Sequence, residues 1–240
     1  MPGYAAAAPK VTADSSCREH LVELGRRIRI RAEVTPGESP VRSVALYDNG
    51  YLLETRTQAP YQFDVELSEK YYGDKNYMVP GRDGRALSLL SDHKFTVVAT
   101  DEAGKAGYCE AGAFFSLYRP GVSQPHGGAA QPVPGVLNLS RYDEGGQGVA
   151  YLDGTPGNTA AGPEKFRADG DVDVSAAGTI GFIGGGEWVN YSVDCAEAGK
   201  YRVKAEYAHA ATPHAKRVRL FSNRRELGVI ELRAPSARWN

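Results

Sequence analysis

The chain has 240 residues, of which 42% are hydrophobic and 24% are charged, and its formal net charge is -1. This near-neutral balance argues against nucleic acid or an anionic membrane as the main partner, because both attract proteins with a basic excess. No apolar run approaches the roughly 18 residues of a membrane span, so we expect no membrane insertion. The 28 glycines and 14 tyrosines beside two methionines favour an all-β chain of one or two domains.

The N-terminal segment, residues 1–16, is predicted to be a tail. Its first ten residues, MPGYAAAAPK, contain four alanines but no basic region leading into a long apolar core, so we do not expect a signal peptide.

Short strands with turn residues between them follow the tail. In residues 27–34, RIRIRAEV, apolar side chains alternate strictly with arginines and Glu33, as in a strand with one buried face. The Asn49-Gly50 pair between two β-prone runs predicts a tight hairpin. Residues 61–67 and 95–99 alternate again, with a turn expected at 101–104. This spacing predicts a β-sandwich.

The three cysteines show no metal-binding spacing and are too few for a disulfide framework. Cys17 and Cys109 lie near opposite ends of the first domain, where the first and last strands of a sandwich often meet. The sequence therefore leaves open both a Cys17–Cys109 disulfide and free thiols. Cys195 is expected to pack as a small apolar residue.

The first domain resembles a known family in the stretches SVALYDNGYLLETRTQAPYQFDVEL and HKFTVVATDEAGK. Both are similar to bacterial immunoglobulin-like repeats of secreted multidomain enzymes, which implies such a domain over residues 17–118. An insertion at about 68–92 departs from the pattern and carries Tyr71, Tyr72 and Tyr77. These tyrosines are expected to pack within a long loop, with glycan contact as the alternative.

Residues 119–133 are rich in Pro, Gly and Ala and have no apolar period, so they are predicted to be a linker. Beyond them, two strands are expected. The first runs from Trp188 to Val193, with Trp188 in the core. The second covers residues 201–208, where apolar and charged side chains alternate.

The stretch GEWVNYSVDCAEAGKYRV, preceded by VPGVLNLSRYDEGGQGVAYLDGTPGNTAAGPEKFRADGDVDV, resembles the family-6 carbohydrate-binding modules. These modules are jelly-roll (galactose-binding-like) β-sandwiches appended to polysaccharide-degrading enzymes. The resemblance covers residues 134–240. It implies a non-catalytic module that binds a polysaccharide such as xylan, β-glucan or agarose, attached to a catalytic domain in the same full-length chain. It also implies a secreted or cell-surface bacterial location.

The resemblance also assigns candidate sugar-binding residues. In the family, two aromatic side chains sandwich a sugar in a cleft at the loop end of the fold. Phe166 occupies the first aromatic position, where tyrosine is more usual, and Trp239 occupies the second. Tyr151 lies near the family's polar contact. Phe166 and Trp239 could each cap a core instead.

Two departures from the family bear on metal binding and on completeness. The family's usual calcium-binding glutamates are replaced by Asn138 and Ser140, so a structural calcium is doubtful and no other cofactor is expected. The family's fold continues past the tryptophan, so the chain is predicted to be a fragment with an incomplete second sandwich. The acidic run around Asp171 and Asp173 lacks the glycine and glutamate of a calcium loop, and we interpret it as a strand with Val172 and Val174 inside and the acids outside.

The sequence offers no positive sign of catalysis. No HExxH or GxSxG motif occurs, and no pair of carboxylates stands out as a glycosidase pair. We therefore expect a non-catalytic glycan-binding module with an immunoglobulin-like spacer. The alternatives are a surface adhesin, a purely structural sandwich, and an enzyme whose carboxylates converge only in the folded chain.

Overall fold

A computed structural model describes residues 7–67, 93–112, 115–155, 157–160, 166–167, 170–175, 177–209 and 216–232. The chain divides into two compact units, Met1–Asp194 and Cys195–Asn240. The regular elements of the described residues are strands and two short 3-10 helices, so the predicted all-β class is confirmed.

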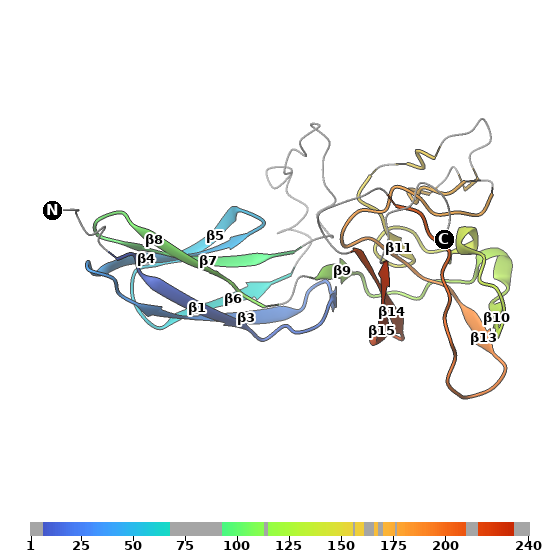
Figure 1. The fold of residues 1–240 in the computed structure, drawn as a ribbon, viewed down its shortest axis with the longest axis horizontal. Helices are drawn as coiled ribbons and strands as arrows, with labels where there is room; N and C mark the ends of the chain where they lie inside the picture. The colour runs from blue at the N-terminus through green and yellow to red at the C-terminus, as the bar shows by residue number, and fades with distance from the viewer. Residues whose placement is uncertain are drawn as a thin grey trace. The chain divides into compact units, whose positions relative to one another are not determined.

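The N-terminal part of the first unit is a two-layer β-sandwich (Figure 1). One layer is a three-stranded sheet in the order β1-β3-β6, and the other is a four-stranded sheet in the order β5-β4-β7-β8. All neighbours in both sheets are antiparallel. The bounds are β1 Lys10–Ser15, β3 Arg27–Thr35, β4 Val41–Asp48, β5 Tyr51–Arg56, β6 Tyr61–Glu66, β7 Phe95–Asp101 and β8 Ala106–Glu110.

The sequence pattern explains this sandwich. The apolar residues of β3 and β6 point inward, and the outward arginines pair across strands, Arg27 with Glu66 and Arg29 with Asp64, each at 2.6 Å. Asn49 and Gly50 both have positive φ, 46° and 88°, so the predicted hairpin between β4 and β5 is confirmed. A parallel pair, β2 (Leu21–Glu23) and β9 (Ser116–Tyr118), was not foreseen.

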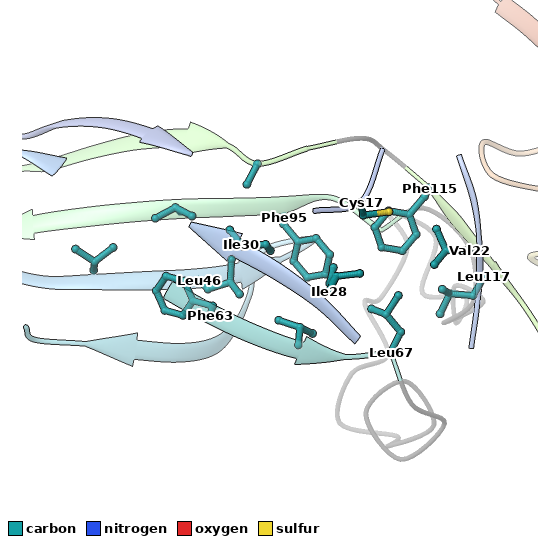
Figure 2. Packing of buried hydrophobic residues seen from close by; sticks show 14 of the residues in the cluster. Cys17, Val22, Ile28, Ile30, Leu46, Phe63, Leu67, Phe95, Phe115 and Leu117 are labelled. Atoms are coloured by element: carbon teal, nitrogen blue, oxygen red, sulfur yellow. The ribbon is translucent and has the colours of Figure 1, made fainter. Parts of the chain in front are cut away.

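The core between the two layers is continuous and apolar (Figure 2). Phe95 and Phe115 pack together with a centroid distance of 5.9 Å. The Cys17 thiol lies in the same cluster and is 1% exposed. The cluster's largest fully buried members are Val22, Ile28, Ile30, Val44, Leu46, Phe63, Leu67, Phe95, Phe115, Leu117 and Leu152.

Residues 10–15, inside the predicted tail, form strand β1 instead. This strand pairs with β3 along its full length, from Lys10 opposite Thr35 to Ser15 opposite Ile30. Val11 and Ala13 pack against the core. Two small apolar side chains give too weak an alternation to be recognised in sequence, and the ladder to β3 supplies the remaining stabilisation.

Residues 119–194 contain short ladders around a second apolar cluster. Strand β10 (Gln131–Val133) pairs with β13 (Val193–Cys195), and β11 (Tyr151–Leu152) pairs with β12 (Trp188–Val189). The 3-10 helices are η2 (His126–Gly128) and η3 (Leu139–Arg141). The buried members of the cluster are Tyr142, Ala150, Tyr151, Val172 and Val174, with Ile180, Val189 and Tyr191 packed against them.

The predicted linker, residues 119–133, is hydrogen bonded to the segment that follows it. The backbone N–H of Arg119 donates to Gly148 O at 2.7 Å, and Gln124 and Glu144 exchange two backbone hydrogen bonds. Gln131 N donates to Ser192 O at 2.9 Å. The predicted domain boundaries stay predictions, but this segment has fixed partners along its length.

The second unit contains an antiparallel hairpin of β14 (Lys216–Ser222) and β15 (Arg225–Leu232). The strand expected over residues 201–208 is absent, and residues 201–206 are exposed. Alternation shows which face a strand would bury, but a strand also needs a neighbour to complete its backbone hydrogen bonds. Cys195, expected to be packed, is exposed as well, because its short strand β13 is exposed at all three residues.

Candidate functional site

Phe166 is the candidate site residue whose placement best suits contact with a ligand. The Phe166 side chain is exposed, at 37%, and lies outside every strand. The ring of His126, from η2, meets it edge to face with centroids 6.3 Å apart. A planar aromatic ring in contact with solvent offers an apolar face for stacking.

Buried polar contacts fix the backbone at Phe166. The buried side chain of Asn158 donates from Nδ2 to Phe166 O and to Val174 O, each at 2.8 Å. Its Oδ1 accepts from the backbone N–H of Ala160 at 2.9 Å. One side chain therefore joins three backbone segments behind the exposed ring.

The neighbouring Arg167 adds a second anchor. Its guanidinium carbon lies 3.5 Å from the centroid of the Tyr142 ring, and its Nη1 donates to Tyr142 O. Nη2 contacts Glu144 Oε2 at 2.7 Å. The Arg167 side chain is only 8% exposed, so this cation–π contact is largely desolvated and correspondingly strong.

Glu144 links the two sides of this surface. One of its carboxylate oxygens contacts Arg167 and the other lies 2.6 Å from His126 Nδ1. Both oxygens therefore have partners, although the Glu144 side chain is 47% exposed. We call Phe166, His126, Glu144 and Arg167 the Phe166 surface. Apart from Phe166, its members were missed in the sequence: His126 and Glu144 come from separate segments that only folding brings together, and the contacts of Arg167 are with those segments.

The other two candidate sugar-binding residues are placed differently. Trp239 lies outside the described residues, as do Tyr71, Tyr72 and Tyr77. Tyr151 is buried, at 6% exposed, and its hydroxyl lies 3.3 Å from Asp171 Oδ2. Burial raises the pKa of the Tyr151 phenol, and its ring packs edge to face on Tyr142. Tyr151 supports the core behind the Phe166 surface, and its assignment as a sugar contact stays a prediction.

Asn138 and Ser140, at the family's calcium-ligand positions, are hydrogen bonded to each other. Asn138 Oδ1 accepts hydrogen bonds from Ser140 N at 3.0 Å and from Ser140 Oγ at 2.7 Å, which caps η3. Both side chains are neutral and supply none of the carboxylate charge that favours calcium, so weak or absent calcium binding at these positions stays a prediction. Within the described residues, no three His, Cys, Asp or Glu side chains are grouped as metal ligands, and no helix is long and apolar enough to cross a membrane.

The acidic residues near Val172 differ in part from the prediction. Val172 and Val174 are buried, as expected, but they lie in no strand, and Val174 alone forms an isolated bridge, to Ile180. Asp173, expected outside, is 1% exposed and accepts hydrogen bonds from the backbone N–H and the hydroxyl of Thr159. These local donors replace the water that an outward carboxylate would bind.

Two further carboxylates have raised pKa values because of burial. Asp153 accepts from the backbone N–H and hydroxyl of Thr155, each at 2.9 Å. Glu187 accepts from Gly154 N at 2.8 Å and from Gly184 N at 2.6 Å. Nearby acids, Asp173 among them, raise both pKa values further. In the structure, Glu187 joins the loops at Gly154 and Gly184, whereas the Asp153 carboxylate bonds within its own loop.

No protein-family model matches the chain, and no curated protein matches it, so the resemblance to family-6 modules stays a prediction. Among solved structures, it is similar to the fibronectin(III)-like modules of Clostridium thermocellum CbhA, at 23% identity over 45% of this chain and 93% of that chain, with a TM-score of 0.29. It is also similar to a 1.5-MDa bacterial ice-binding adhesin, at 12% identity over 50% of this chain and 35% of that chain, with a TM-score of 0.28. Both scores are below 0.5, so the fold assignment rests on the sheets described above.

Proposed function

We propose that this chain is a non-catalytic polysaccharide-binding module and that the Phe166 surface is its binding site. The exposed Phe166 ring, backed by buried anchors, is the observation that carries this proposal. Sugar rings present C–H groups on their faces, which pack on an aromatic face, and their hydroxyls bond to carboxylate and imidazole groups at the rim. The His126 ring meets the Phe166 ring edge to face, and Glu144 contacts His126, which supports assigning these two side chains to the rim.

The wider context belongs to the same proposal. The module works in a secreted or cell-surface bacterial protein, tethered to a catalytic domain of the full-length chain. Binding raises the local concentration of that domain at the polysaccharide, because the second contact becomes intramolecular.

The adhesin alternative predicts an exposed apolar patch on the immunoglobulin-like sandwich. Among the described residues of that sandwich, the large exposed apolar side chains are Leu52 and Tyr108. They lie on β5 and β8, which are opposite edges of the four-stranded sheet. These two side chains do not make one patch, and we favour the glycan-binding proposal.

Affinity electrophoresis against xylan, β-1,3-glucan, cellulose and agarose tests the proposal. Phe166→Ala is compared with Phe182→Ala, which removes an equally large ring that is 75% exposed in the same part of the chain. Losing one stacked ring should weaken binding roughly ten- to hundredfold. Trp239→Ala run in parallel tests the second predicted aromatic.

We expect one polysaccharide to retard the wild type and the Phe182→Ala variant but not the Phe166→Ala variant. Equal retardation of the wild type and Phe166→Ala would contradict the assignment of the site. A folded wild type that no polysaccharide retards would contradict glycan binding on this panel.

A further inference from the structure

The short ladder β11–β12 lies between the two apolar clusters. Leu152 is opposite Trp188, and Tyr151 is opposite Val189. Leu152 belongs to the core of the immunoglobulin-like sandwich, and Trp188 packs against that core. Tyr151 and Val189 belong to the second cluster. Because side chains alternate along a strand, one face of this ladder completes the first core and the other face completes the second.

Hydrogen bonds reinforce the contact on the side of the sandwich. The Trp188 indole N–H donates to Leu117 O at 3.3 Å, and Ser116 Oγ donates to Gly186 O at 2.6 Å. Leu117 and Ser116 are themselves buried, at 0% and 5% exposed. Both lie on β9, which pairs with β2, and Leu117 belongs to the sandwich core.

The chain is hydrogen bonded where it leaves β9. Arg119, the residue after β9, donates its backbone N–H to Gly148 O at 2.7 Å. Gly148 N in turn donates to Tyr151 O at 2.6 Å, which leads directly into β11. Two successive backbone hydrogen bonds therefore connect the end of β9 to the start of β11.

We propose that the β11–β12 ladder couples the two cores, so that the described residues up to 194 unfold as one cooperative unit. The immunoglobulin-like sandwich is then an obligate structural partner of the following segment and not a detachable spacer. Leu152 is 1% exposed and packs within the sandwich core. Without the sandwich, Leu152 and one face of Trp188 would contact water, and the two-residue ladder would lose half of its packing.

Hydrogen exchange of the full chain, followed by mass spectrometry across a urea series, tests the coupling. If the cores are coupled, the slowest amides of β7, in the sandwich, and of β11 and β12 converge on one urea dependence and open with the same free energy. If the cores are independent, the β7 amides stay protected at urea concentrations that already release β11. This second result would overturn the proposal, and the measurement needs no variant.

A buried valine in the second cluster gives a sharper second test. Val174 is 1% exposed and belongs to the second cluster but not to the sandwich core. Val174→Ala should therefore speed the exchange of the slowest β7 amides roughly ten- to hundredfold, although β7 lies in the other core. Leu227→Ala, at a side chain that is 65% exposed on β15, is the matched control and should change neither set. Faster exchange in β11 with unchanged β7 amides in Val174→Ala would refute the coupling.

Discussion

Replacing Arg167 with methionine should destabilise the first unit strongly. Methionine keeps the apolar stem and, like arginine, carries a Cβ, so the positive φ of 53° at this position is equally costly in both. The change therefore isolates the contribution of the guanidinium. The Arg167 side chain is 8% exposed.

The expected loss follows from the contacts of the guanidinium. The desolvated cation–π contact with Tyr142 is worth about 2 kcal/mol. A hydrogen bond from a charged donor to a backbone carbonyl adds about 1.5–3 kcal/mol. The half-exposed Glu144 contributes less than about 1 kcal/mol. The buried methionine recovers part of this, so we expect a decrease of about 3 kcal/mol in the free energy of unfolding.

Urea unfolding followed by far-UV circular dichroism measures the effect. Arg141→Met is the matched control, because Arg141 is exposed and the hydrogen bond from its guanidinium to His126 O is long, at 3.4 Å. The control should stay within about 0.5 kcal/mol of the wild type. A similarly small effect in Arg167→Met, or equal effects in both variants, would refute the reasoning that the Phe166 surface depends on this anchor.

Three further outcomes follow from the fold. Burial raises the pKa of the Cys17 thiol to about 11, so iodoacetamide at neutral pH should modify exposed Cys195 readily and Cys17 only after unfolding; rapid native labelling of Cys17 would contradict this burial. The hydrogen bond from Arg26 lowers the pKa of Glu19 to about 2, so its stabilisation is complete above pH 4.5 and is lost as the pH falls toward 2. Glu19→Gln should make the urea midpoint slightly less dependent on pH between those values. An unchanged pH dependence in the variant would count against the pair. Gly50→Ala should cost about 1 kcal/mol in thermal unfolding from backbone strain alone, because nothing lies within 4 Å of the added Cβ, and no loss would mean that the turn relaxes.

The sandwich was largely predictable because its signals are local. In residues 27–34 the alternation itself separates the buried from the exposed face, and Asn49-Gly50 specifies the turn. The same reasoning failed where pairing with a neighbouring strand decides whether a segment forms a strand. Residues 201–208 alternate equally well, yet the structure has no strand there, while β1 forms on a weak pattern because β3 offers an edge.

The candidate site was only partly predictable because its support is not local. Phe166 could be named from the sequence, but its anchors could not. Asn158 reaches Val174 across 16 residues, and Arg167 reaches Glu144 across 23. Neither spacing matches a strand or helix period, so no sequence pattern indicates these contacts. Asp173 was misplaced for the same reason, since its partner Thr159 lies 14 residues away.

The Phe166 surface owes its rigidity to buried polar groups and not to a sheet. Phe166 lies in no strand, so backbone ladders do not hold it in place. Asn158 and Arg167 do so instead, through the backbone carbonyls of Phe166, Val174 and Tyr142. A stacking platform must be ordered before the ligand arrives, because ordering it on binding would cost affinity. Substitution of the buried anchor Asn158 should therefore weaken glycan binding although its side chain is not part of the binding surface, and Phe166→Ala should weaken binding with little loss of stability.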